Sequence, residues 1–206
     1  MTEQKNNRQQ QKLKTRKAIK SVAKKAFTDK GIEATNTREV SAKAGVAVGT
    51  FFSHFPDKMS LVKEIFFEEM TLAIDSRLDV LLNDFDLEPT DFSISCASLL
   101  FDFYLAHREY TMVVMNESLL QQGFLQTQLD TLKTSLCARF EAIDVDANSA
   151  TIFSNNMMAN FQYVLLAMLS AESSNKAIWI QELRQLNLPF EHIYQNALKR
   201  FHRNGL

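Results

Sequence analysis

Turn-forming residues are scarce in this chain, which has 5 Gly and 3 Pro among 206 residues. A sheet built from hairpins needs many tight turns, whereas long helices need few, so the scarcity favours helices. Apolar residues also recur at helical spacing along most of the chain, and no stretch shows the alternation of a half-buried strand. The clearest stripe comprises Ala18, Ile19, Val22, Ala23, Ala26 and Phe27. The sequence therefore predicts an all-α fold.

Charge is distributed unevenly along the chain. Residues 1–60 contain 13 Lys and Arg and 5 Asp and Glu, a net charge of +8, whereas residues 61–206 contain 10 and 19, a net charge of -9. A basic N-terminal part on an acidic body indicates that only the N-terminal part meets a polyanion. The alternative is a solvated basic tail, and the charge asymmetry alone does not distinguish the two.

Composition and helix signals divide the chain into three parts. Residues 1–14 are polar and basic, which predicts a flexible arm. Residues 15–60 carry three short helical patterns and form a candidate DNA-binding head. Residues 61–206 continue with longer helical patterns, which predict a larger body. We therefore expect a small three-helix head joined to a larger helical body.

Within the head, two short helices are expected to follow the first one. Asn36 is a suitable N-cap, and Glu39 stands three residues later in the position that completes a capping box. Gly45 ends this helix, and the next runs from Val48 until Pro56 stops it. Two short helices with a glycine turn between them predict a helix-turn-helix, whose second helix enters the major groove of DNA.

The residues around this turn form a recognisable set: Gly31, Thr35, Glu39, Ala44-Gly45-Val46, Gly49-Thr50-Phe51-Phe52-Ser53-His54-Phe55 and Lys58. Together they resemble the N-terminal domain of the TetR family of transcriptional regulators, over about residues 15–65. The resemblance implies an N-terminal helix-turn-helix, a helical body that binds a ligand, and a homodimer. Beyond residue 65 the chain matches the family in its length and helical pattern.

The resemblance also implies which residues contact double-stranded DNA. The phosphate contacts fall on Thr37, His54 and Lys58, and the base or nearby phosphate contacts on Arg38, Val48, Thr50 and Ser53. Gly49 lets the backbone approach DNA closely, and the ring of Phe52 packs against sugar. Cations of the N-terminal segment add further contacts: Lys5, Arg8, Lys12, Lys14 and Arg16.

Each of these assignments has a structural alternative. His54 is instead a packed histidine of the head, Arg38 and Lys58 are solvated charges, and the arm is merely disordered. Two positions also depart from the family pattern, because Phe52 stands where Tyr is usual and Ala47 where a polar helix cap is usual. We expect both departures to weaken DNA binding, since the first removes a phenolic phosphate contact and the second costs about 1 kcal/mol of helix stability.

The body is rich in Phe and Met, which suits either a packed core or a pocket for a small apolar or amphipathic effector. By resemblance, the middle helices form such a pocket, and we assign it to Phe101, Tyr104, Met112 and Met115. The segment 161–169 is apolar nearly all round and needs two buried faces. By resemblance, helices within 147–170 and 176–203 form the dimer interface, which we assign to Phe161, Val164, Leu165, Met168, Ile193 and Ala197.

Several other classes of protein are not indicated. No apolar run is long enough to span a membrane, and no signal peptide precedes the head. Cys96 and Cys137 stand apart without a metal-ligand pattern, no catalytic set or Gly-rich phosphate loop is visible, and we expect neither cofactor nor metal.

The sequence thus favours a bacterial cytoplasmic, nucleoid-associated protein that is not an enzyme. We interpret it as a ligand-responsive homodimeric repressor of a palindromic operator. An activator or global nucleoid-associated DNA binder of the same fold is the alternative. An all-helical enzyme or binding module with an incidental basic head is a third interpretation.

Overall fold

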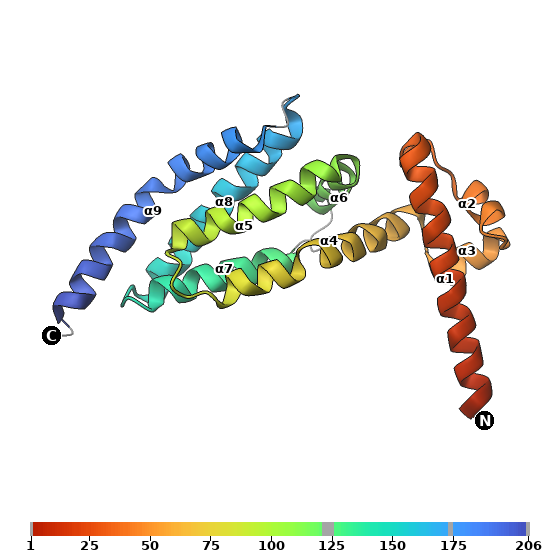
Figure 1. Cartoon of the computed structure of the whole chain (residues 1–206), viewed down its shortest axis with the longest axis horizontal. Helices are drawn as coiled ribbons and strands as arrows, with labels where there is room; N and C mark the ends of the chain where they lie inside the picture. The colour runs from red at the N-terminus through yellow and green to blue at the C-terminus, as the bar shows by residue number, and fades with distance from the viewer. Residues whose placement is uncertain (1, 121–125, 173–174, 205–206) are drawn as a thin grey trace. The chain divides into compact units, whose positions relative to one another are not determined.

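A computed structural model describes residues 2–120, 126–172 and 175–204 of the chain. Within these ranges it contains helices and no strand, so the predicted all-α fold is confirmed. The helices, shown in Figure 1, are α1 Thr2–Lys30, α2 Thr37–Lys43, α3 Val48–His54, α4 Lys58–Asn83, α5 Pro89–Ala106, α6 Arg108–Leu120, α7 Gln126–Glu141, α8 Ala147–Ser170 and α9 Lys176–Asn204.

The chain divides into two compact units. The first comprises residues 1–71 together with 109–114, and the second comprises residues 72–108 and 115–206. Two helices therefore contribute to both units, because the divisions fall inside α4 and α6. Residues 2–14, for which we expected a flexible arm, form the first half of α1. We call the first unit the head and the second the body.

Local signals explain the ends of the helices in the head. Gly31 follows α1 with a φ of 86°, a left-handed conformation that glycine adopts without a Cβ penalty. The side chain of Asn36 accepts a hydrogen bond of 2.9 Å from the backbone N–H of Glu39, as expected of an N-cap of α2. Gly45 follows α2 with a φ of 69°. Ala47, at the N-cap of α3, makes no side-chain cap.

The body is built around α5, α7, α8 and α9, in which α5 packs on α9 and α8 packs on both α7 and α9 (Figure 1). Phe101 is fully buried and stacks on Phe161, with ring centroids 5.6 Å apart. The structure also buries the neighbours of Phe161 on the same face of α8. All four α8 residues that we assigned to the dimer interface lie in the core of one chain instead: Phe161, Val164, Leu165 and Met168.

Arg139 of α7 fixes the end of α4 against the body. One guanidinium nitrogen donates hydrogen bonds to the carbonyls of Leu81 (3.0 Å) and Asp84 (2.7 Å), where the helix leaves carbonyls without intrahelical partners. The guanidinium carbon lies 3.8 Å from the ring centroid of Phe92. Arg139 is 2% exposed, so solvent cannot replace these interactions.

We predict that Arg139→Met lowers the free energy of unfolding by about 3 kcal/mol, because the part-buried carbonyls of Leu81 and Asp84 lose hydrogen bonds from a charged donor. Urea denaturation followed by circular dichroism measures this change. The matched control is Arg184→Met, since Arg184 makes an exposed ion pair of 2.9 Å with Asp91, and such pairs contribute less than about 1 kcal/mol. Equal stability losses in the two variants would contradict the role given to Arg139.

Candidate nucleic-acid interface

The turn between α2 and α3 has the geometry of a helix-turn-helix. The N–H of Gly45 donates to the carbonyl of Ala42 (3.1 Å), and the N–H of Val46 donates to the carbonyl of Ser41 (3.0 Å). These bonds reverse the chain directly after α2, and the positive φ of Gly45 permits the reversal. The two short helices therefore pack on one another beside α1 (Figure 1).

Helix α3 has a buried and an exposed face. Phe51 and the following Phe55 are fully buried, with ring centroids 5.9 Å apart. On the opposite side, Val48 is 37% and Phe52 is 47% exposed. Large apolar side chains that the head leaves in solvent are available to contact another surface.

Most of the residues predicted to contact DNA lie on or beside this exposed face. Gly49 and Ser53 are exposed and Thr50 is half-buried. The hydroxyl of Ser53 donates to the carbonyl of Thr50 (2.7 Å). At the start of α2, Arg38 is exposed and Thr37 is half-buried.

His54 is placed differently from these residues, because it is buried in the head. Its Nδ1 atom is buried without a hydrogen-bond partner. Burial lowers the pKa of His54 below its usual 6.5, and the positive charges of Arg16 and Lys12 lower it further. The packed-histidine alternative describes this environment, in which the imidazole stays neutral at pH 7.

Lys58, the first residue of α4, holds the turn between α1 and α2. Its ammonium group donates hydrogen bonds to three backbone carbonyls, those of Ile32 (2.9 Å), Glu33 (3.1 Å) and Thr35 (3.0 Å). An ammonium group has three N–H donors, so all three are engaged inside the head. In this structure Lys58 is therefore not a solvated charge, and none of its three N–H groups is free to bind phosphate.

The same turn is held from the other side by Glu109 of α6. Its carboxylate accepts a hydrogen bond of 2.5 Å from the N–H of Ile32. A Cβ added to Gly31 would lie 3.1 Å from the same carboxylate oxygen, so the glycine also leaves room for Glu109. Tyr110 packs edge-on against Phe27, with ring centroids 5.9 Å apart. Sequence reasoning missed Glu109, because its partner is a backbone group 77 residues away.

Arg16 links α1, α3 and α4. Its Nε donates to Glu64 (2.8 Å), another guanidinium nitrogen donates to the carbonyl of His54 (2.5 Å), and the guanidinium lies over the ring of Phe55 at 4.1 Å. Hydrogen bonding to Arg16, and then to Lys20, lowers the pKa of the Glu64 carboxyl. The sequence placed Arg16 among the cations that contact DNA, but in the structure it positions the end of α3.

The residues proposed for an effector pocket do not line a common cavity among the described pockets. Phe101 and Tyr104 are buried in the body, and burial raises the pKa of the Tyr104 hydroxyl above its usual range. Met112 belongs to the head, where it is 43% exposed, and Met115 is half-buried in the body.

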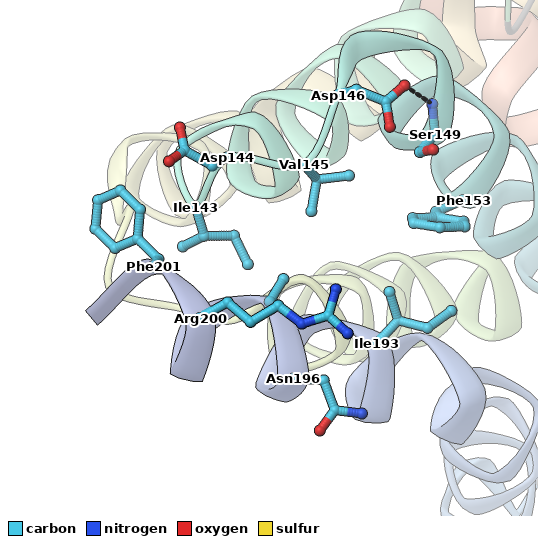
Figure 2. Close-up of a pocket in the computed structure, with 11 residues that line it drawn as sticks. Ile143, Asp144, Val145, Asp146, Ser149, Phe153, Ile193, Asn196, Arg200 and Phe201 are labelled. Atoms are coloured by element: carbon cyan, nitrogen blue, oxygen red, sulfur yellow. Dashed lines mark hydrogen bonds between the residues drawn. The ribbon is translucent and has the colours of Figure 1, made fainter. Parts of the chain in front are cut away.

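Ile193 and Ala197, which we assigned to the dimer interface, are half-buried in the wall of a pocket of about 480 Å³ (Figure 2). This pocket lies between the end of α7, the start of α8 and the last turns of α9. Arg200 extends along it, and the carboxylates of Asp144 and Asp146 lie at its rim (Figure 2). Both signs of charge therefore occur in this pocket.

No three His, Cys, Asp or Glu side chains in the described part of the chain are grouped so that they could hold a metal ion. None of the described helices combines the length and the apolar character needed to cross a membrane.

Comparison with known proteins identifies the helix-turn-helix segment. Residues 19–65 match the family described as bacterial regulatory proteins, tetR family. No curated protein matches the chain.

Solved structures similar in fold include a putative TetR-family transcriptional regulator from Mesorhizobium loti, at 15% identity and a TM-score of 0.58, covering 88% of this chain and 97% of the other. A TetR variant from Acinetobacter baumannii in complex with minocycline has 14% identity and a TM-score of 0.59, covering 85% and 96%. GusR of Salmonella enterica has 21% identity and a TM-score of 0.53, covering 91% and 96%. At these identities the likeness concerns the fold.

We predict that Lys58→Met lowers the free energy of unfolding in the absence of DNA by about 1–3 kcal/mol, because three carbonyls lose their donor. Chemical denaturation measures the change. Lys25→Met is the matched control, since Lys25 is an exposed lysine of α1. If Lys58 served only to contact phosphate, both variants would unfold at the same urea concentration.

We also predict that His54 makes the protein less stable as the pH falls below 6.5. The unfolded chain then binds a proton that the folded chain, with its lowered pKa, does not bind, so protonation favours unfolding. His54→Gln should remove the part of the fall in the free energy of unfolding, between about pH 7.5 and about pH 5.5, that His54 causes. Urea denaturation at both pH values measures this fall. The control His202→Gln, at an exposed histidine, should keep the wild-type dependence. A dependence unchanged in His54→Gln contradicts the assignment.

Proposed function

We propose, on the match of residues 19–65 to the tetR family of bacterial regulatory proteins, that this chain is a homodimeric repressor that binds a palindromic operator and releases it when a small effector binds. The observation that carries the proposal is the exposed face of α3. A short helix held firmly on one side and open on the other suits insertion into the major groove of DNA.

The proposed contacts follow from what each side chain is free to do. Arg38 is exposed on α2 and can donate two hydrogen bonds to guanine, and Val48 can contact a thymine methyl group. Thr37, Thr50 and Ser53 supply hydroxyls for phosphate or base edges.

Lys58 and His54 act through position. Lys58 fixes the turn before α2, and His54 is the buried last residue of α3.

Dimerisation is proposed to use the exposed apolar side chains of α8 and α9. On α8, Ile152, Tyr163 and Leu166 are 47%, 58% and 39% exposed, and they recur at helical spacing. On α9, Ile178 and Leu188 are 52% and 41% exposed. A two-fold dimer places two heads on DNA, and the two heads together read a palindrome whose half-sites lie about one helical turn apart.

The response to an effector is proposed to pass through the two helices that belong to both units. Glu109 in the first turn of α6 accepts the N–H of Ile32, and Lys58 at the start of α4 holds the carbonyl of the same residue. A change in the body that moves either helix therefore acts on one turn of the head. The effector must bind the DNA-free state more tightly than the DNA-bound state, because otherwise it shifts no equilibrium.

The test is binding of the purified protein to a fluorescent DNA fragment carrying its own promoter region, with random DNA of equal length as reference. We predict tighter binding to the promoter fragment, a stoichiometry of two chains per site, and weakening of about tenfold or more in Arg38→Ala, since a base-contacting arginine contributes about 1–3 kcal/mol. Fluorescence anisotropy gives the affinities.

Arg184→Ala, which removes an exposed arginine of α9, is the control and should bind DNA as the wild type does. Raising the salt concentration from about 50 to about 200 mM should weaken binding steeply through release of counterions. Equal and weak binding to both fragments would contradict a local repressor and favour a global DNA binder.

A further inference from the structure

A groove runs between α4, α5 and the first turns of α9, entirely within the body. It encloses about 830 Å³, within the usual range of small-molecule sites. Its apolar surface comes from Val80 and Leu81 of α4, Ile94 and Leu99 of α5, and Ile180 of α9. None of the residues that we assigned to an effector pocket from the sequence lies in this groove.

The α4 wall of this groove is poorly covered by the rest of the chain. Val80 is 68% exposed although it is apolar, and Leu72, two turns earlier, is 85% exposed. Between residues 71 and 80 only Ile74 is buried. An apolar molecule seated in the groove would remove such surface from water, which is favourable.

The polar part of the groove carries positive charge. Arg77 of α4 lines it, and none of the described residues forms an ion pair or hydrogen bond with its guanidinium. No carboxylate lines the groove among the residues that the structure describes. Lys176, whose ammonium group reaches the groove wall at Ser98, is held by Asp102 (2.7 Å) and by the Ser98 hydroxyl (3.1 Å). Arg77 is therefore the cation free to receive a ligand.

Hydroxyl groups complete this polar part. Ser76 of α4 and Ser95 of α5 line the groove beside Arg77 and can each donate one hydrogen bond. The pocket in Figure 2 differs in this respect, because the carboxylates of Asp144 and Asp146 line it together with Arg200 and would repel an anion. The two pockets thus offer different chemistry, because a cation and two carboxylates line the first, whereas a cation, hydroxyl groups and apolar side chains without a carboxylate line the groove.

We propose that the groove between α4, α5 and α9 binds an amphipathic anion, with its carboxylate, sulfate or phosphate group on Arg77 and its apolar body on Val80, Leu99 and Ile180. Four of the lining residues belong to α4, the helix that begins in the head at Lys58. The binding site stands independently of DNA binding. That its occupant controls DNA binding rests on the proposed function.

The probe is decanoate, compared with decyltrimethylammonium, which has the same chain length and the opposite charge. Trp179 is the only tryptophan of the chain and precedes Ile180 of the groove, so its fluorescence reports binding. We expect decanoate to change the Trp179 emission saturably and the cation not to do so. Isothermal titration calorimetry with the full chain gives the affinity.

Two variants locate the site. Arg77→Met should weaken decanoate binding about tenfold or more, because a charge-assisted hydrogen bond is lost. Val80→Asp, at an exposed position, places a carboxylate in the groove and should abolish binding without disturbing the core. Arg184→Met, on α9 outside the groove, is the matched control. Unchanged affinity in Arg77→Met and Val80→Asp, or a preference for the cation, overturns the proposal.

Promoter-fragment anisotropy, repeated with and without decanoate, separates the two proposals. Saturable, Arg77-dependent binding by a protein that does not bind DNA upholds the groove and overturns the repressor. Specific DNA binding without Arg77-dependent decanoate binding upholds the repressor and overturns the groove. Arg77-dependent binding that lowers the affinity for the promoter fragment supports both.

Discussion

The head depends on how one turn, residues 31–35, satisfies its backbone groups. The Lys58 ammonium donates hydrogen bonds to three carbonyls of this turn, and the Glu109 carboxylate accepts a hydrogen bond from one of its N–H groups. The turn itself supplies one hydrogen bond, from the N–H of Thr35 to the carbonyl of Ile32 (3.3 Å), and backbone groups that are left unpaired and shielded from water are costly. Because the donor begins α4 and the acceptor begins α6, the end of α1 and the start of α2 are defined by two helices that continue into the body.

The sequence predicted the local structure well, because local structure has local causes. The Asn36 cap and the short helices on either side of Gly45 each depend on neighbours within a few residues, and the structure contains both. Helical spacing likewise predicted an all-α chain. The Glu109 contact and the environment of His54 involve residues far apart in the sequence, and periodicity carries no information about such pairs.

Helix α8 also shows that the sequence does not reveal which parts of the molecule meet. An apolar segment such as 161–169 indicates that a helix is buried on more than one side, but it does not indicate whether the second side meets another helix of the same chain or a second copy. In the structure α8 packs on α7, α9 and α5, which accounts for the burial of Val164 and Met168 without a partner. Surface for a second copy must then come from residues such as Tyr163 and Leu166, which lie between the buried ones.

The folded head carries less free positive charge than the sequence suggested. Residues 1–71 with 109–114 contain 14 Lys and Arg and 9 Asp and Glu, so the net charge of the compact unit is +5 and not the +8 of residues 1–60. Arg16 and Lys20 are paired with Glu64, and Lys58 is engaged by carbonyls. Counterion release follows the number of phosphates that a protein neutralises. The salt dependence of DNA binding should therefore reflect cations such as Arg38, while the paired cations hold α3 in place and contribute to affinity through geometry.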